Sequence, residues 1–346
     1  MDLRGDPSPN RSANATGTAP AHLWVTSLLG ATLLATWVLG VAGNAYTLAV
    51  TSTALRRSAS LCVYVVNLAL ADLLYLSTIP FVVCTYFARD WLFGETGCRV
   101  LLSLDLLTMH ASVFVLGAMS LERYRAVASP FRARRASAAS RRLAALAIWA
   151  ASFLLALPMM LMVRLHRDRP EPAGPPRRIC SPTWTPAAFR AYLTVLFCTS
   201  VLGPGLMIAG LYAGLAWRYW AVQAGLGPLG GGAAAVAGGR RGPKRRVVTM
   251  VFAIVLAHWA CFLPFWAWQL AKLYSPGTLG GLSPATHTYV NFALTCLTYG
   301  NSCVNPLLYT LLTRSYRDYL AQKARPASSA GPDPAGPGGA TALRHP

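Results

Sequence analysis

The sequence predicts an all-α membrane protein, a bundle of seven transmembrane helices followed by a short amphipathic eighth helix. Three observations support this prediction. Of its 346 residues, 54% are hydrophobic and only 12% are charged, whereas average soluble domains carry roughly 25% charged residues. Seven apolar stretches each approach the roughly 20 residues that a membrane-spanning helix needs. Basic residues gather in alternate connecting segments, as they do between transmembrane helices.

The apolar stretches follow one another along the chain, separated by polar, Arg-rich or Gly/Pro-rich segments. They cover about residues 23–53, 61–88, 98–124, 143–163, 191–217, 247–271 and 285–313. An odd number of crossings places the two ends of the bundle's chain on opposite sides of the membrane. The sequence therefore predicts a multi-pass protein with membrane lipid as a partner.

The distribution of basic residues predicts the orientation. If residues 1–22 lie outside, 19 of the 31 Lys and Arg residues face the cytoplasm, 11 face outward and Arg123 stands at a helix end. Cytoplasmic loops of membrane proteins carry this excess, so an extracellular N-terminus at the plasma membrane is expected. The same distribution explains the net charge of +20 without a nucleic-acid partner.

Four regions are predicted along the chain. Residues 1–22 lack a basic-then-apolar leader, so no cleavable signal peptide is expected, and Asn10 and Asn14 begin glycosylation acceptor tripeptides. The bundle occupies residues 23–313 and the amphipathic helix residues 314–324. The Pro/Gly/Ala-rich residues 325–346 are predicted to form a disordered cytoplasmic tail.

Few charged residues interrupt the apolar stretches, and each costs on the order of 2.5–3.5 kcal/mol at a helix centre. They are Asp72, Asp105 and the pair Glu122-Arg123. A helix that contains both Asp105 and Arg123 separates them by about 27 Å, which places Asp105 in the outer third. Asp105 is either a buried acid paired with a neighbouring Tyr or His, or the acceptor of a ligand cation. Asp72 favours a structural or ionic role, and Glu122-Arg123 could be an ordinary helix-end ion pair.

Short motifs recur in a fixed order along the chain. They include "GN" at 43–44, "NLALAD" at 67–72, "LERY" at 121–124, "CFLP" at 261–264 and "NSCVNPLLY" at 301–309, with Trp149, Pro158, Pro204 and Tyr212 between them. Over residues 23–322 this set resembles the rhodopsin-like (class A) G-protein-coupled receptors. "LTMHAS" (107–112), "WACFLPFW" (259–266) and "CLTYGNSC" (296–303) are similar to the urotensin-II subgroup, which belongs with the somatostatin and opioid peptide receptors.

The resemblance implies a receptor for a cyclic urotensin-II-like peptide. It would signal through a heterotrimeric G protein of the Gq class to phospholipase C and calcium release. Asp105 would accept the lysine of a disulfide-closed Phe-Trp-Lys-Tyr turn. The surface around the peptide would come from Met109, Phe265, Trp266, Gln269 and Tyr299.

The resemblance also implies a disulfide, Cys98–Cys180, that holds the loop before the fifth helix. That loop carries Arg164, Arg167, Arg169, Arg177 and Arg178, either as an attraction for an acidic ligand tail or as a solvated basic surface. The other six cysteines lie within apolar stretches without CxxC spacing, so zinc and redox sites are not expected.

Two further groups of residues take their expected roles from the resemblance. Asp72, Ser112, Asn301 and Asn305 resemble a sodium site, and no other cofactor is expected. The residues expected to act in activation and G-protein coupling are Glu122, Arg123, Tyr124, Tyr212, Phe262, Pro264, Asn305, Pro306 and Tyr309. Phe262 replaces the Trp of most class members, a feature of the urotensin-like subgroup. Lys244 stands where rhodopsin has an acid, so packing and Glu122 must hold the inactive state.

Other functions fit the sequence less well. An aminergic receptor would also use Asp105 and Tyr299, but Leu196 and Phe197 stand where amine receptors often have hydroxyls, although Ser200 remains. An opsin needs a lysine in the seventh helix, and the stretch 285–313 has none. A proton-coupled transporter could use Asp72 and Asp105 as a relay, but no internal repeat is visible. No cluster of nucleophile, base and orienting group supports an enzyme.

Overall fold

The computed structural model describes residues 15–55, 62–128, 137–168, 177–223 and 241–312. Within these ranges the regular secondary structure is helical except for one antiparallel hairpin of two strands. The helices are α1 (Ala15–Leu55), α2 (Cys62–Leu76), α3 (Ile79–Ala88), α4 (Gly94–Ala128), α6 (Ala138–Met162), α7 (Pro186–Phe197), the π-turn η1 (Cys198–Leu202), α8 (Gly203–Gln223), α9 (Arg241–Tyr274), α10 (Pro276–Leu279) and α11 (Pro284–Leu312). The hairpin pairs β1 (Val163–Asp168) with β2 (Arg177–Pro182).

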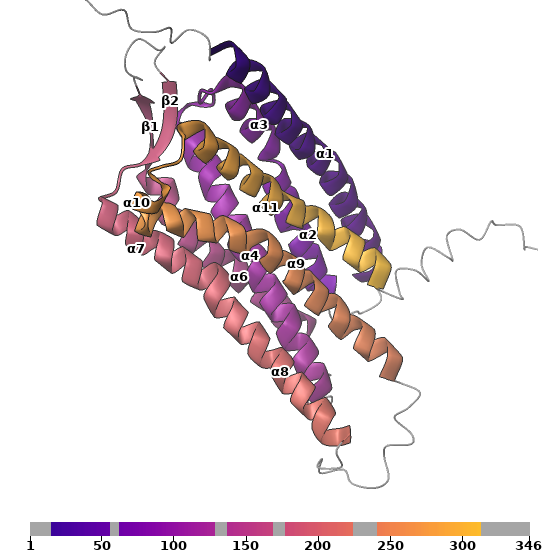
Figure 1. Ribbon diagram of the computed structural model, residues 1–346. Coiled ribbons are helices and arrows are strands. Elements are labelled where there is room, and N and C mark those ends of the chain that lie inside the picture. Colours follow the sequence, from indigo (N-terminus) through magenta and orange to yellow (C-terminus); the bar gives the residue numbers. More distant parts are fainter. Residues whose placement is uncertain (1–14, 56–61, 129–136, 169–176, 224–240, 313–346) are drawn as a thin grey trace, which may run out of the picture.

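Two of the predicted transmembrane stretches are interrupted helices. The stretch 61–88 breaks between α2 and α3, beside Pro80, which cannot donate a backbone hydrogen bond and disfavours helical conformation in the residue before it. The stretch 191–217 passes through η1, where the missing N–H of Pro204 is accommodated by the wider turn. Each interrupted stretch still runs as one rod through the bundle (Figure 1).

The seven-helix bundle is confirmed. Six helical segments are long and apolar enough to cross a membrane. The seventh, α11, has 29 residues, about 44 Å of helix, but its composition is more polar, with several Thr and Asn residues. The predicted amphipathic helix (314–324), the tail (325–346) and the acceptors Asn10 and Asn14 lie outside the described residues.

The first helix is longer than its apolar stretch indicated. It begins at Ala15 rather than near residue 23. Hydropathy marks where a helix becomes apolar, and the apolar span of this helix begins at Trp24. The more polar residues before it are helical without belonging to that span. The helix therefore reaches into the segment predicted as the extracellular N-terminus.

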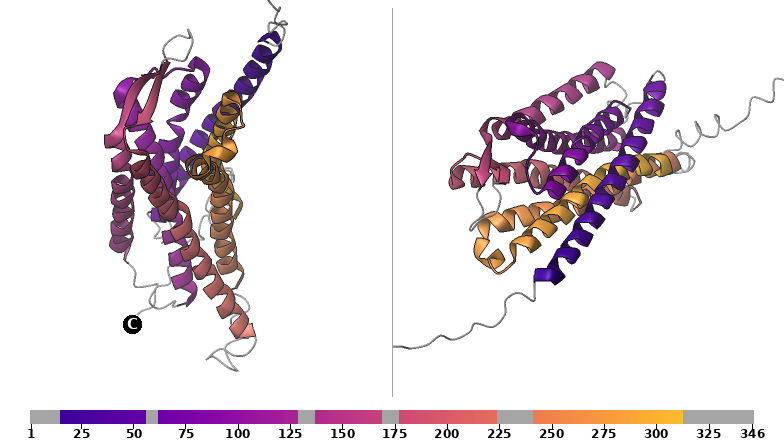
Figure 2. Two further views of the ribbon diagram at one scale, coloured as in Figure 1. Left: turned by 60° about the vertical axis from the view of Figure 1, so that its left-hand side comes forward. Right: turned by 90° about the horizontal axis from the view of Figure 1, so that it is seen from above.

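The helix α4 is the centre of the bundle and packs against α2, α6, α8 and α9. The first helix, α1, lies at the edge beside α2 and α11, as the view from above shows (Figure 2). The β1–β2 hairpin covers one end of the bundle (Figure 1), which we call the hairpin end. The start of α4 also lies there, because Cys98 is bonded to Cys180 of β2.

Candidate functional site

Asp105 lies on α4, about three turns from the start of the helix, and its side chain is half-buried. Thr78 Oγ1 lies 3.3 Å from Asp105 Oδ1, 2.7 Å from the carbonyl oxygen of Tyr75 and 2.5 Å from the Tyr299 hydroxyl. A hydroxyl has a single proton to donate, and the Tyr75 carbonyl is the nearer acceptor. The hydrogen bond to the carboxylate is therefore long and shared.

No basic side chain of the described residues neutralises Asp105. The ion pairs found in this part of the chain join Arg99 to Glu95, Arg141 to Glu122 and Arg178 to Asp90. The sequence left open that a neighbouring Tyr or His pairs with Asp105. In the structure the carboxylate contacts Thr78 instead, and Tyr299 reaches it only through the Thr78 hydroxyl. A partly buried carboxylate in this situation favours binding of an external cation.

The wall beside Asp105 is fixed by stacked tyrosines. The rings of Tyr75 and Tyr299 lie 4.1 Å apart, and the Tyr75 hydroxyl lies 2.9 Å from Thr298 Oγ1. Tyr299 is fully buried. These contacts join α2 to α11, so the carboxylate faces a wall whose side chains have little freedom.

A second part of the site is aromatic and lies between α4, α7 and α9. Met109, Phe262 and Trp266 are buried in one cluster, and Phe265 packs against it. Gln269 is half-buried one turn beyond Phe265. The structure thus brings Met109, Phe265 and Trp266 together, and it joins Asp105 to Tyr299 through Thr78. No hydrogen bond found among the described residues links Gln269 to either group.

The residues of the predicted sodium site lie deeper in the bundle. Asp72 is 1% exposed and accepts a 2.8 Å hydrogen bond from Asn305 Nδ2. Asn301, one turn earlier on α11, has a buried Oδ1 without a hydrogen-bond partner in the described part of the chain. Ser112 is buried as well. Among these four residues a direct hydrogen bond is found only between Asp72 and Asn305. A carboxylate with neutral amide and hydroxyl oxygens suits a hard monovalent cation, and the unpartnered oxygen of Asn301 fits that use.

The end of α4 opposite the hairpin carries the Glu122-Arg123 pair. Glu122 Oε1 lies 3.4 Å from Arg141 Nε of α6, so Glu122 is paired across helices. Arg123 Nε is buried without a hydrogen-bond partner among the described residues. Tyr212, from α8, packs at the edge of the neighbouring core cluster, and the centre of its ring lies 5.1 Å from the centre of the Phe252 ring of α9.

The remaining residues expected to act in activation are placed by their helices. Pro264 lies inside α9 and Pro306 inside α11, and Tyr124 follows Arg123 on α4. Tyr309 belongs to α11, but its side chain and that of Lys244 lie outside the described residues. Arg123 and Tyr124 therefore lie in the last two turns of α4, whereas Tyr212 lies in the middle of α8.

The hairpin is attached at two points. The Cys98–Cys180 disulfide is confirmed, with Cα atoms 5.6 Å apart. The Arg178 backbone N–H donates to Asp90 Oδ1 at 2.6 Å, and Arg178 Nη2 donates to Oδ2 at 2.6 Å. Arg178 is therefore engaged, whereas Arg164, Arg167 and Arg177 are exposed and Arg169 lies outside the described residues.

Neutralising Asp90 should loosen the hairpin. The side-chain hydrogen bonds from Arg178 lower the pKa of Asp90 below its ordinary value. A lowered pKa means that the contact stabilises the fold above the unfolded pKa of about 3.9 and is lost as pH falls through the folded pKa. At neutral pH, Asp90→Asn should therefore speed amide hydrogen exchange at Arg178 and Trp91. Unchanged exchange, with Glu95→Gln as the control variant, would contradict this.

Sequence reasoning missed Thr78 and its contact to Asp105. Thr78 stands two residues before Pro80, and a polar residue at a proline-induced helix break is the signal that could have identified it. His110 was also missed: its Nδ1 lies 2.8 Å from the Leu106 carbonyl oxygen and its Nε2 lies 3.0 Å from Thr199 Oγ1. This contact joins α4 to η1.

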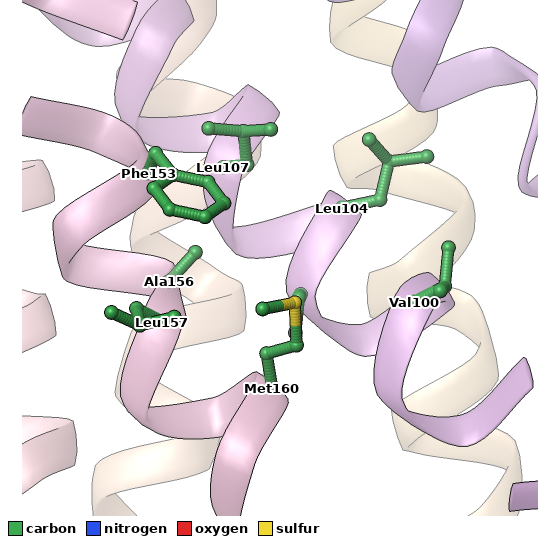
Figure 3. Close-up of a pocket in the computed structure, with 8 residues that line it drawn as sticks. Val100, Leu104, Leu107, Phe153, Ala156, Leu157 and Met160 are labelled. Atoms are coloured by element: carbon green, nitrogen blue, oxygen red, sulfur yellow. The ribbon is translucent and has the colours of Figure 1, made fainter. Parts of the chain in front are cut away.

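An apolar cavity of about 160 Å³ lies between α4 and α6 (Figure 3). Its lining residues are Val100, Ser103, Leu104, Leu107, Phe153, Ala156, Leu157 and Met160. Asp105 is not among them. The cavity suits a hydrocarbon group and is separate from the carboxylate and the aromatic cluster.

Comparisons with known proteins identify the family. Residues 43–309 match the model of the "7 transmembrane receptor (rhodopsin family)". The chain is 49% identical to the urotensin-2 receptor of Macaca mulatta over 330 residues, which cover 94% of this chain and 80% of that protein. It is 49% identical to the Homo sapiens urotensin-2 receptor over 93% of this chain and 80% of that protein. The somatostatin receptor type 4 of Rattus norvegicus is 31% identical over 81% of this chain and 68% of that protein. The chain thus belongs to the rhodopsin family of seven-transmembrane receptors, which are membrane proteins without enzymatic activity.

Proposed function

We propose that this protein is a plasma-membrane receptor for a cyclic urotensin-II-like peptide. The observation that carries the proposal is the Asp105 carboxylate, which lacks a basic partner among the described residues. A carboxylate with one long hydrogen bond favours a cationic ligand group. Similarity to urotensin-2 receptors supports a peptide that carries that cation on a lysine.

The neighbouring side chains suit the rest of such a peptide. Met109, Phe265 and Trp266 form a soft and aromatic surface that can pack against the Trp and Tyr of a Phe-Trp-Lys-Tyr turn. The Trp266 indole N–H is buried without a partner in the described part of the chain. A ligand that approaches or moves this ring would alter the packing of Phe262 on α9.

We further propose that the hairpin end faces the outside of the cell and that the opposite end binds a Gq-class G protein. The excess of Lys and Arg in the alternate loops supports this orientation, and it would expose Asn10 and Asn14 to glycosylation. Separation of α8 and α9 from α4 would uncover Arg123, whose Nε has no partner among the described residues. This unpartnered, buried Nε in a partly exposed guanidinium favours such a rearrangement.

Calcium release tests the function directly. Cells that express the receptor are titrated with the cyclic peptide Cys-Phe-Trp-Lys-Tyr-Cys, and inositol phosphate and intracellular calcium are measured. A saturable response that a Gq inhibitor blocks is the expected result. No response from a receptor detected at the cell surface would contradict the peptide assignment, and a response to monoamines instead would favour an aminergic receptor.

Asp72 offers a separate test of the sodium site. We expect sodium chloride to weaken agonist binding to the wild-type receptor, with choline chloride as the ionic-strength control. Asp72→Asn should remove the difference between the two salts, because the site then lacks its single charged oxygen ligand. A sodium effect that persists in Asp72→Asn would show that these residues do not bind the ion.

A further inference from the structure

A second charged group lies nearer the hairpin end, on the last turn of α9. Lys272 Nζ donates a 3.4 Å hydrogen bond to Asn291 Oδ1 of α11. The side chain is exposed, and no acid of the described residues pairs with it. An ammonium has three donors, and this one long contact to a neutral amide uses only one of them.

The Asn291 amide is held in place from its other side. Its Nδ2 donates to the Tyr86 hydroxyl at 3.2 Å, and the Tyr86 ring stacks on Phe292 at 3.8 Å with 7° between the planes. These contacts join α3 to α11 and turn the amide oxygen toward α9. Asn291 thus positions the lysine without neutralising it.

The same wall of α11 carries both charged groups. Asn291, which contacts Lys272, and Tyr299, which leads to Asp105 through Thr78, are separated by about 12 Å along the helix. Phe292 and Tyr299 belong to one buried cluster, with Tyr75 and Tyr86 packed against it. The site is therefore bipolar, with a carboxylate deeper in the bundle and an ammonium nearer the hairpin end.

Most of the other charges described near the hairpin end are already engaged. Arg178 is bonded to Asp90, Arg99 to Glu95, and the Arg190 guanidinium lies 5.5 Å from the centre of the Tyr274 ring. The exposed Arg164, Arg167 and Arg177 lie on the hairpin or at its ends. Lys272 differs from them because a hydrogen-bonded side chain on the Asp105 wall orients it.

We propose that Lys272 binds a carboxylate of the peptide whose lysine is bound by Asp105. The inference rests on the proposed function, because Asp105 must first anchor the ligand. In a cyclic Cys-Phe-Trp-Lys-Tyr-Cys peptide the C-terminal carboxylate lies two residues after the lysine. Two extended residues and the lysine side chain can together span about 12 Å. An acidic residue next to the ring supplies the same chemistry.

Binding of three peptides to two receptor variants tests this inference. The peptides are the cyclic hexapeptide with a free carboxylate, its C-terminal amide, and the amide extended by an aspartate before the first cysteine. The receptors are wild type and Lys272→Gln, with Lys272→Arg as the charge-preserving variant. Arg190→Gln is the control for loss of a nearby positive charge.

Lys272→Gln is expected to weaken binding of the peptide whose carboxylate contacts Lys272 by about twofold to fivefold, the range for a solvent-exposed ion pair. The loss should shrink at high salt, be reversed in Lys272→Arg, and be absent for the C-terminal amide, which has no carboxylate. Whichever acidic peptide shows the loss identifies the source of the carboxylate. An equal loss of affinity for all three peptides would mean that Lys272 only supports Asn291, and it would overturn the inference. No loss of affinity for any peptide would overturn it as well.

The outcome is independent of the test of Asp105. If Asp105→Ala binds the hexapeptide as wild type does, the proposed function fails whatever Lys272 does. If Asp105→Ala loses peptide binding while Lys272→Gln binds the free-acid and amide peptides with equal changes in affinity, Asp105 still binds the peptide lysine and only the carboxylate site is wrong.

Discussion

Asp105→Ala is expected to lower the binding affinity of the cyclic Trp-Lys-Tyr peptide, and its potency in calcium release, by a hundredfold or more. Removing one member of a buried ion pair typically costs roughly 3–5 kcal/mol, since the other charge is left desolvated. In Asp105→Ala the peptide lysine loses its carboxylate partner. Thr78, whose Oγ1 lies 3.3 Å from Asp105 Oδ1, offers only a neutral hydroxyl in its place.

Two controls separate this loss from misfolding. Glu95→Gln removes an exposed acid that pairs with Arg99 on the same helix, and it should leave binding unchanged. Asp105→Asn keeps the shape of the side chain and a hydrogen bond to Thr78, yet it should lose binding nearly as strongly as Asp105→Ala. Full binding by Asp105→Asn at normal surface expression would assign the residue a structural role.

Removing the Cys98–Cys180 disulfide should abolish high-affinity peptide binding. The bond closes a loop with a sequence separation of 82 residues, and disulfides typically contribute about 2–5 kcal/mol to small domains. It also holds β2 against the start of α4, about 10 Å along that helix from Asp105. The double variant Cys98→Ser/Cys180→Ser should lower both the melting temperature of the purified receptor and its peptide affinity.

The matched control is Cys84→Ser, because Cys84 is an exposed free cysteine on α3. It removes a thiol without breaking a bond, so melting temperature and affinity should stay at wild-type values. A double variant that binds the peptide as well as Cys84→Ser does would show that the hairpin need not be held for recognition.

Hydropathy and charge predicted the bundle because each helix must be long and apolar enough to cross the membrane by itself. The same reasoning located Asp105 and Asp72, since a carboxylate in an apolar helix is conspicuous. The apolar stretch 23–53 agrees with the span Trp24–Thr51, but the helix itself begins at Ala15, because residues can form helix without being apolar. A boundary of this kind depends on backbone hydrogen bonds that hydropathy does not report.

Contacts between helices were harder to predict. Glu122 pairs with Arg141 of α6, and Thr78 contacts Asp105 across two helices, because helix rotation and the break beside Pro80 decide which side chains meet. The Lys272–Asn291 contact depends on how α9 packs against α11. Such contacts require relative helix positions, which spacing within one helix cannot supply.

A double-mutant cycle tests the central claim, that Asp105 binds the lysine of a cyclic peptide, most directly. Binding is measured for the Cys-Phe-Trp-Lys-Tyr-Cys peptide and its norleucine analogue, each with wild type and with Asp105→Ala. If the two charges meet, each single change costs about a hundredfold and the double change costs little more. Losses that multiply, with the norleucine peptide weakened equally by Asp105→Ala, would contradict the claim.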